Sequence, residues 1–208
     1  MYAGAAAGNR WVQWHQTPER TPEMTQTDDV VTLLRAQHDR IRNLFTEVDT
    51  VVGSDVKQSR FEELRALLAV HETAEEMVVH PQARHGADGD TVVDERLQEE
   101  HDAKRLLSGL DGMQVTDPDF SPRFAELRSA VLAHAASEER EEFPLLLQTS
   151  DEKLRATMAR AVIAAEAMAP THPHPGVESM TANLLVGPVA SLVDRTRDAV
   201  RAVLGPGS

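Results

Sequence analysis

Histidine and glutamate recur at the same spacing in two segments of this 208-residue chain. Residues 60–81 and 123–144 align with an offset of 63 positions and are identical at 9 of 22 positions. In each segment a His is followed four positions later by a Glu, and one turn of an α-helix brings such side chains next to each other. Each pair therefore offers a nitrogen and an oxygen donor to a metal ion. The two pairs are His71 with Glu75 and His134 with Glu138.

An isolated His lies 33 residues before the His of each pair. These two isolated residues, His38 and His101, are related by the same offset of 63 positions as the two segments. We expect these imidazoles and carboxylates to face inward on helical stripes of Leu and Val. A buried, unpaired carboxylate costs several kcal/mol, so the set predicts a bound cation. Imidazole with carboxylate suits Fe, Mn, Zn or Co better than Ca or Mg, which prefer all-oxygen shells.

The number of donors predicts two ions, because six ligands exceed the three or four of a mononuclear zinc site. Each ion would take two imidazoles, and Glu75 and Glu138 would bridge between the ions. Coordination positions would then remain for water, O2 or peroxide, so we expect a reactive site. The predicted ligands are His38, His71, Glu75, His101, His134 and Glu138.

Other polar residues near the motif receive other roles. Glu76 and Glu139 each lie 100° beyond a predicted ligand, and Glu72 lies 100° from His71. We expect these carboxylates to face solvent or to support the ligands from outside. His80 lies 180° from His71 on a continuous helix, which predicts that it points away from the cavity.

Helical periodicity accounts for most of the chain, and Gly-, Asp- and Pro-containing segments separate the helices. Short turns make successive helices antiparallel neighbours. The sequence therefore predicts an all-α fold: an up-down-up-down four-helix bundle with a short extra helix and an amphipathic C-terminal helix. The helices are expected at about residues 28–52, 56–80, 91–110, 122–148, 151–168 and 188–204.

Three regions are expected along the chain. Residues 1–27 show no sustained period and are interpreted as a disordered N-terminal tail. Residues 28–169 form the bundle, and residues 170–208 combine a Pro-rich linker with the C-terminal helix. That helix is a candidate surface for a homodimer or a protein partner.

Composition excludes several classes of function. The chain has no cysteine, which rules out disulfides, thiolate metal sites and Fe–S clusters. A formal charge of −13 argues against nucleic acid and anionic membranes as partners. No apolar run approaches the length of a membrane span, and the start of the chain lacks the pattern of a secretory signal. We expect a cytoplasmic protein.

The pattern HxxxEExxxxP, present twice and each time preceded by an isolated His, resembles the hemerythrin-like (HHE cation-binding) family. The resemblance covers about residues 29–148. It implies a four-helix bundle with a non-haem di-iron centre that meets O2, hydrogen peroxide or nitric oxide. Carried over by position, the iron ligands would be His38, His71, Glu75, His101, His134 and Glu138. Iron is favoured over Mn or Zn.

The sequence departs from the oxygen carriers of that family. The oxygen carriers have a second His one turn after the His of the third helix, and there this chain has Arg105. They also have an Asp ligand where this chain has Glu138. Reversible O2 transport is therefore disfavoured, and peroxide or O2 chemistry, with possible catalase-like activity, is expected. Arg42 and Arg105 either steer anionic ligands to the site or pair with acidic residues at the surface.

Two alternatives differ in class from a reactive di-iron protein. One is an iron or redox sensor that signals through its C-terminal region without turnover. The other is a purely structural bundle, which leaves the buried His and Glu residues unexplained. The sequence does not decide whether the site turns over, so catalytic residues stay unassigned.

Overall fold

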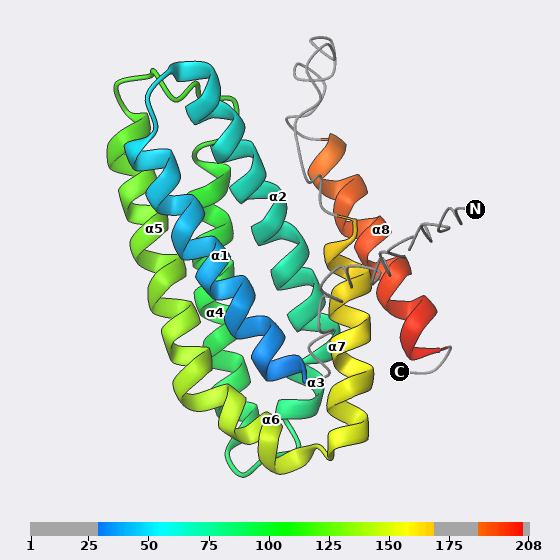
Figure 1. The fold of residues 1–208 in the computed structure, drawn as a ribbon. Coiled ribbons are helices and arrows are strands. Elements are labelled where there is room, and N and C mark those ends of the chain that lie inside the picture. The colour runs from blue at the N-terminus through cyan, green and yellow to red at the C-terminus, as the bar shows by residue number, and fades with distance from the viewer. Residues whose placement is uncertain (1–28, 169–186, 206–208) are drawn as a thin grey trace, which may run out of the picture.

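The computed structural model describes residues 29–168 and 187–205, and these residues form a helical bundle (Figure 1). The predicted N-terminal tail and most of the predicted Pro-rich linker lie outside the described residues. The predicted all-α fold is confirmed. The elements are α1 (Val30–Thr50), α2 (Ser54–Val78), α3 (His80–Ala83), α4 (Gly89–Ser108), α5 (Phe120–Ser137), the π-helix η1 (Glu138–Glu142), α6 (Phe143–Thr149), α7 (Glu152–Glu166) and α8 (Gly187–Leu204).

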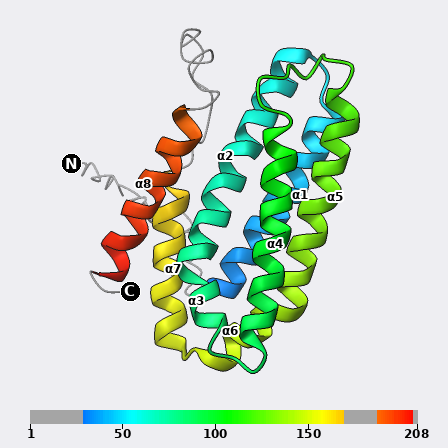
Figure 2. The ribbon, with the colours of Figure 1, turned by 180° about the vertical axis from the view of Figure 1, so that it is seen from behind.

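Four long helices make the bundle. Helices α1 and α5 form one layer and α2 and α4 the other, as the two opposite views show (Figures 1 and 2). Helix α1 packs against α2, and α4 packs against α5. Each helix that carries an isolated His thus lies beside the helix that carries the following His–Glu pair. The turn between α1 and α2 uses Gly53 at φ 102°, a conformation that residues with a Cβ rarely adopt.

Two apolar clusters fill the bundle at different heights. At the end with the α1–α2 and α4–α5 turns, four Phe rings pack together with centroids 5.0 to 5.8 Å apart. At the other end, the start of α1 and the end of α2 pack against α7 and α8. The four rings belong to Phe45, Phe61, Phe120 and Phe124. In sequence, His38 of α1 and His134 of α5 each lie between residues of the two clusters.

Helices α7 and α8 extend the bundle beyond α2 (Figure 1). Asp29 caps α1 by accepting hydrogen bonds from the backbone of Val31 and Thr32, and its second oxygen lies 2.7 Å from Arg155 of α7. Leu192 and Val200 of α8 are buried against the same cluster. The predicted extra helix and C-terminal helix are thus both docked on the bundle.

Two helices that the sequence predicts as continuous are interrupted. Helix α2 ends at Val78, and the chain continues into the short helix α3. The predicted helix 122–148 contains a π-helical turn, in which the Phe143 N–H donates to the Glu138 carbonyl. Pro144 follows this turn directly and has no N–H for a regular helical bond, so the wider turn accommodates it.

Within the described part of the chain, no helix is both long enough and apolar enough to cross a bilayer.

Candidate metal centre

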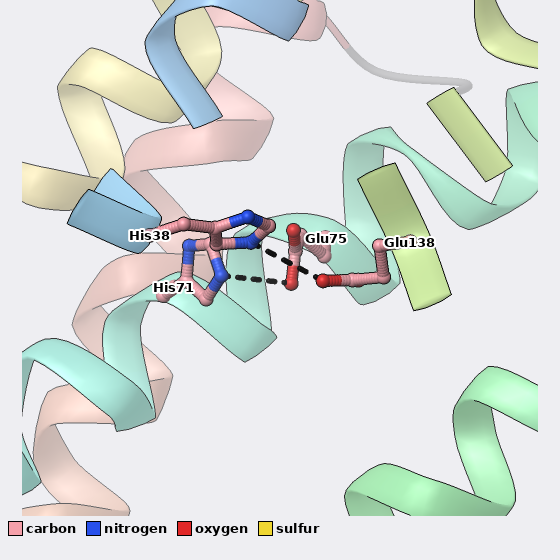
Figure 3. Close-up of side chains that lie close together, drawn as sticks. All are labelled: His38, His71, Glu75 and Glu138. Atoms are coloured by element: carbon pink, nitrogen blue, oxygen red, sulfur yellow. Dashed lines mark ion pairs between the residues drawn. The ribbon is translucent and has the colours of Figure 1, made fainter. Parts of the chain in front are cut away.

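Four side chains from three helical elements converge in the bundle interior. His38 of α1, His71 and Glu75 of α2 and Glu138 of η1 each offer a donor atom, and these atoms all lie within 4.8 Å of one another (Figure 3). His71 Nε2 lies 3.3 Å from Glu75 Oε2, and His38 Nε2 lies 3.2 Å from Glu138 Oε2. All four residues are buried. This arrangement has the composition and dimensions of a cation site.

The outer nitrogen of each imidazole is held by a hydrogen bond. His38 Nδ1 lies 2.8 Å from the Glu139 carboxylate, and His71 Nδ1 lies 2.8 Å from the Gln37 side-chain oxygen. Because both oxygens accept, both imidazoles carry their proton on Nδ1. The lone pair of Nε2 then faces the interior, which is the orientation a metal ligand needs.

His134 of α5 repeats this arrangement. Its Nδ1 lies 3.1 Å from Glu99 Oε2, and its Nε2 lies 3.4 Å from Glu138 Oε1. The carboxylate of Glu138 therefore turns one oxygen toward His38 and the other toward His134. A carboxylate placed between two imidazoles in this way is suited to bridge two metal ions.

Several inward atoms find no hydrogen-bond partner among the residues that the structure describes. A buried polar atom without a partner costs about 1–3 kcal/mol, and more if it is charged. Such atoms are rare in folded proteins, and a cluster of them marks a place where a cation completes the structure. Among them are His38 Nε2, His134 Nε2 and both carboxylate oxygens of Glu75 and Glu138.

The electrostatics of the cluster favour an unprotonated imidazole, which can donate an electron pair, at His71. Burial, together with the neighbouring His38, lowers the pKa of His71 from 6.5 to about 3. Burial and the charge of Glu138 raise the pKa of Glu75 well above its ordinary value. Burial opposes ionisation of Glu138 as well, but the nearby His134 and His38 outweigh it and lower its pKa. A bound cation would stabilise both carboxylates in the charged form.

Apolar and aromatic groups close the site. The ring of Phe143 stacks on His38 with centroids 5.7 Å apart, and His38 meets His71 edge-on at 5.0 Å. Phe143 is fully buried, so this wall excludes water from one side of the imidazoles. A low-dielectric wall strengthens the attraction between a cation and its ligands.

The expectation that His101 faces inward is wrong. His101 is exposed on α4, whereas its neighbour Glu100 is buried. The inward stripe of α4 includes Glu100 and Ala103, while Lys104 and Arg105, which share the face of His101, are exposed. The polar residues one turn after His101 were the sequence signal for this rotation, because a buried stripe requires apolar residues there.

The prediction for His80 is also wrong, because His80 is buried and points into the bundle. Its Nε2 lies 2.6 Å from Glu100 Oε1, and its Nδ1 lies 2.7 Å from Glu142 Oε1. The 100° rule applies only along one continuous helix, and the end of α2 at Val78 separates His80 from His71. No motif in the sequence pointed to Glu100 or Glu142.

The flanking residues take supporting positions. Glu139, expected either at the surface or outside the ligands, holds His38 and also accepts from Arg42 at 2.7 Å. Glu76 instead pairs with Lys104 at 2.6 Å. Arg42 thus pairs with an acidic residue that supports a ligand.

Two further flanking residues lie outside the cluster of four converging side chains. Arg105 is exposed and lies 3.1 Å from Asp102, so it takes the surface pairing that the sequence allowed. Glu72 is buried, 3.5 Å from Lys104, and burial raises its pKa to about 7.

The fold and the site define a helical-bundle protein with a buried His/Glu cation-binding centre. Residues 29–146 match the model of the hemerythrin HHE cation binding domain. The chain belongs to this family.

Two relatives place the chain among known proteins. A protein of Nostoc sp. (strain PCC 7120 / SAG 25.82 / UTEX 2576) described as a DNA nickase is 30% identical over 115 residues, which are 55% of this chain and 32% of that protein. The chain thus matches about a third of that relative's length. A crystal structure of a hemerythrin HHE cation binding domain-containing protein from Mycobacterium kansasii superposes with a TM-score of 0.62. It is 20% identical, the match covers 80% of this chain and 98% of that one, and it supports the shared fold.

Proposed function

We propose that this protein is a cytoplasmic non-haem di-iron protein that binds or reacts with O2, hydrogen peroxide or nitric oxide. The observation that carries the proposal is the set of inward Nε2 atoms and carboxylate oxygens that lack partners within the described residues. Membership of the cation-binding family supports the metal. The donor set favours a transition metal over Ca or Mg.

The ligands divide between two ions. His38, His71, Glu75 and Glu138 would hold the first ion, since their donor atoms lie closest together. His134 would hold the second, with Glu138 as a bridge and with the free oxygen of Glu75 as a second bridge. His101 is left out of this set because it is exposed. Iron with open positions supplies redox chemistry toward O2 and peroxide.

The protein's own residues orient and shield this centre. Glu139, Gln37 and Glu99 hold the Nδ1 protons of the three imidazoles and so fix the direction of each Nε2 lone pair. Phe143 keeps water from the face of His38. A rigid, dry site of this kind keeps bulk water from the centre and limits side reactions.

Metal analysis tests the proposal directly. Protein from iron-replete cells is expected to hold about two irons per chain and to show a charge-transfer absorption that changes on addition of peroxide. His71→Ala is expected to lose iron, while the exposed His85→Ala is the matched control and should retain it. Zinc-only or metal-free wild-type protein would overturn the proposal. Oxygen release from peroxide, measured with an electrode, separates catalase-like turnover from binding alone.

A second candidate function is iron or redox sensing through the C-terminal region. The packing of α7 and α8 against α2 favours it, because α2 carries His71 and Glu75 on its inner face. Iron would then change the docking of α7 and α8. Limited proteolysis with and without iron tests this candidate, and equal cleavage rates in residues 152–204 would exclude it.

DNA nicking is not proposed. The match to the Nostoc DNA nickase covers 32% of that protein, and a formal charge of −13 opposes binding to a phosphate backbone.

A further inference from the structure

His80 lies between two buried carboxylates beside the proposed metal centre. Its two ring nitrogens lie 2.6 Å from Glu100 and 2.7 Å from Glu142, and the three residues come from α3, α4 and η1. All three are buried. Neither ring nitrogen has a lone pair left for a metal ion, so His80 is not a ligand.

The hydrogen bonds indicate the charge of this histidine. A neutral imidazole donates from one nitrogen only, whereas two ionised carboxylates accept from both. The arrangement is therefore that of an imidazolium ion between two carboxylates. Although burial opposes the charge, the bonds to Glu100 and Glu142 raise the pKa of His80 to about 10.

Lys104 adds a second fixed cation on the same side. Its Nζ lies 3.0 Å from Glu100 and 3.5 Å from Glu72. Helix α4 thus turns the carboxylate of Glu100, whose charge His80 and Lys104 balance, toward the bundle interior. At this level of the bundle the repeat predicted an imidazole instead. The side of the centre that faces α1 and α2 has two imidazoles, and the side that faces α4 and α5 has one.

We propose that His80, held between Glu100 and Glu142, acts as a built-in cation that makes the metal centre asymmetric, so that one ion binds tightly and the second binds weakly. The inference rests on the proposed function. The tight site is made by His38, His71, Glu75 and Glu138. The weak site has one imidazole, that of His134, and shares carboxylates with the tight site. In place of a second imidazole it has the carboxylate of Glu100, which already pairs with His80.

A titration of the metal-free protein with Co²⁺ under anaerobic conditions tests the asymmetry. Cobalt is the probe because its visible absorption reports each bound ion. Loss of an outer hydrogen-bond partner alone weakens metal binding about 10–100-fold, so the site with one imidazole fewer should bind at least about tenfold more weakly. Two ions of equal affinity would overturn the inference and leave the proposed function intact. Absence of any cobalt binding would instead overturn the proposed function.

Variants of His80 test its role as the internal cation. In His80→Gln the charge is removed and Glu100 and Glu142 become available, so the affinity for the second cobalt should rise about tenfold or more. His80→Lys retains a cation and should keep the second site weak. His85→Gln is the matched control, because His85 is exposed. An unchanged second affinity in a folded His80→Gln protein would overturn the inference.

Nitrogen NMR of the wild-type protein gives a test that does not depend on any variant. In metal-free protein labelled with ¹⁵N-histidine, His80 is expected to show two protonated ring nitrogens from pH 6 to pH 8. A single protonated nitrogen would overturn the assignment.

Discussion

In the first copy of the repeated motif, α1 and α2 bring their histidines to one point, whereas in the second copy α4 and α5 do not. His38 and His71 are both buried, with ring centroids 5.0 Å apart. In the second copy His134 is buried and His101 is exposed. The two copies share the same spacing, so spacing alone does not set which side of a helix faces the core.

The apolar residues around each histidine explain the difference. One turn beyond His38, Ile41 is buried, and the corresponding residue beyond His101 is Lys104. Burying a Lys without full pairing is costly, so α4 rotates to bury Ala103 and Glu100 instead. The rotation of a helix is therefore set by all the apolar residues on its buried face, and the direction of a single motif residue follows from that rotation.

Loss of a ligand from the first copy is expected to have the largest effect. In His71→Ala the tight ion loses an imidazole, and its affinity should fall by more than the about 10–100-fold that loss of an outer partner causes. His134→Ala should remove the weak ion and leave the tight one largely in place. Cobalt titration of both variants measures the difference. Equal losses in the two variants would contradict the asymmetry between the copies.

Removal of His80 is expected to destabilise the folded protein strongly. His80→Gln leaves two buried carboxylates without their shared partner, and breaking a buried ion pair costs about 3–5 kcal/mol. Urea unfolding of metal-free protein measures the change in the free energy of unfolding. The control His85→Gln should leave it within about 0.5 kcal/mol.

The effect of His80 should also depend on pH. Its pKa in the folded state is raised to about 10 from an ordinary value of 6.5 by Glu100 and Glu142, against the effect of burial. The stabilisation is therefore fully present below about pH 6.5 and is lost as the pH rises through 10. The difference in unfolding free energy between wild type and His80→Gln should shrink between pH 7 and pH 10. A constant difference would contradict the imidazolium.

The outer partners of the imidazoles should give intermediate effects. Glu139→Gln replaces the charged acceptor of His38, and Glu99→Gln does the same for His134. Each is expected to lower the affinity of its own ion about 10–100-fold. Glu95→Gln is the control, because Glu95 is exposed and contacts no ligand imidazole among the described residues. Equal loss of both ions in each variant would argue against separate sites.

Substitution of His101 is expected to have the smallest effect. Because its side chain is exposed, His101→Ala should keep the metal content of the wild type and change stability by no more than about 0.5 kcal/mol. Metal analysis and urea unfolding measure the two quantities. Loss of one metal equivalent would show that α4 turns His101 inward when metal binds.

Much of the architecture was predictable because local patterns determine it. The stripes of α1 and α2 are long and apolar, so the inward directions of His38, His71 and Glu75 follow from the 100° turn per residue. The stripe of α4 is weaker, since charged residues interrupt it on both sides, and the motif match to His101 was misleading there. Helical periodicity gives no sign that α2 ends at Val78, before His80.

The all-α fold, the paired His–Glu motif and the chemistry of its donors follow from the sequence, because they depend on contacts within one turn of a helix. The position of Glu138 between His38 and His134, and the meeting of Glu100, His80 and Glu142, follow only from the packing of the helices. These contacts join residues up to 100 positions apart in the chain. They depend on helix rotation and on the π-turn before Pro144, which the packing of the whole bundle sets.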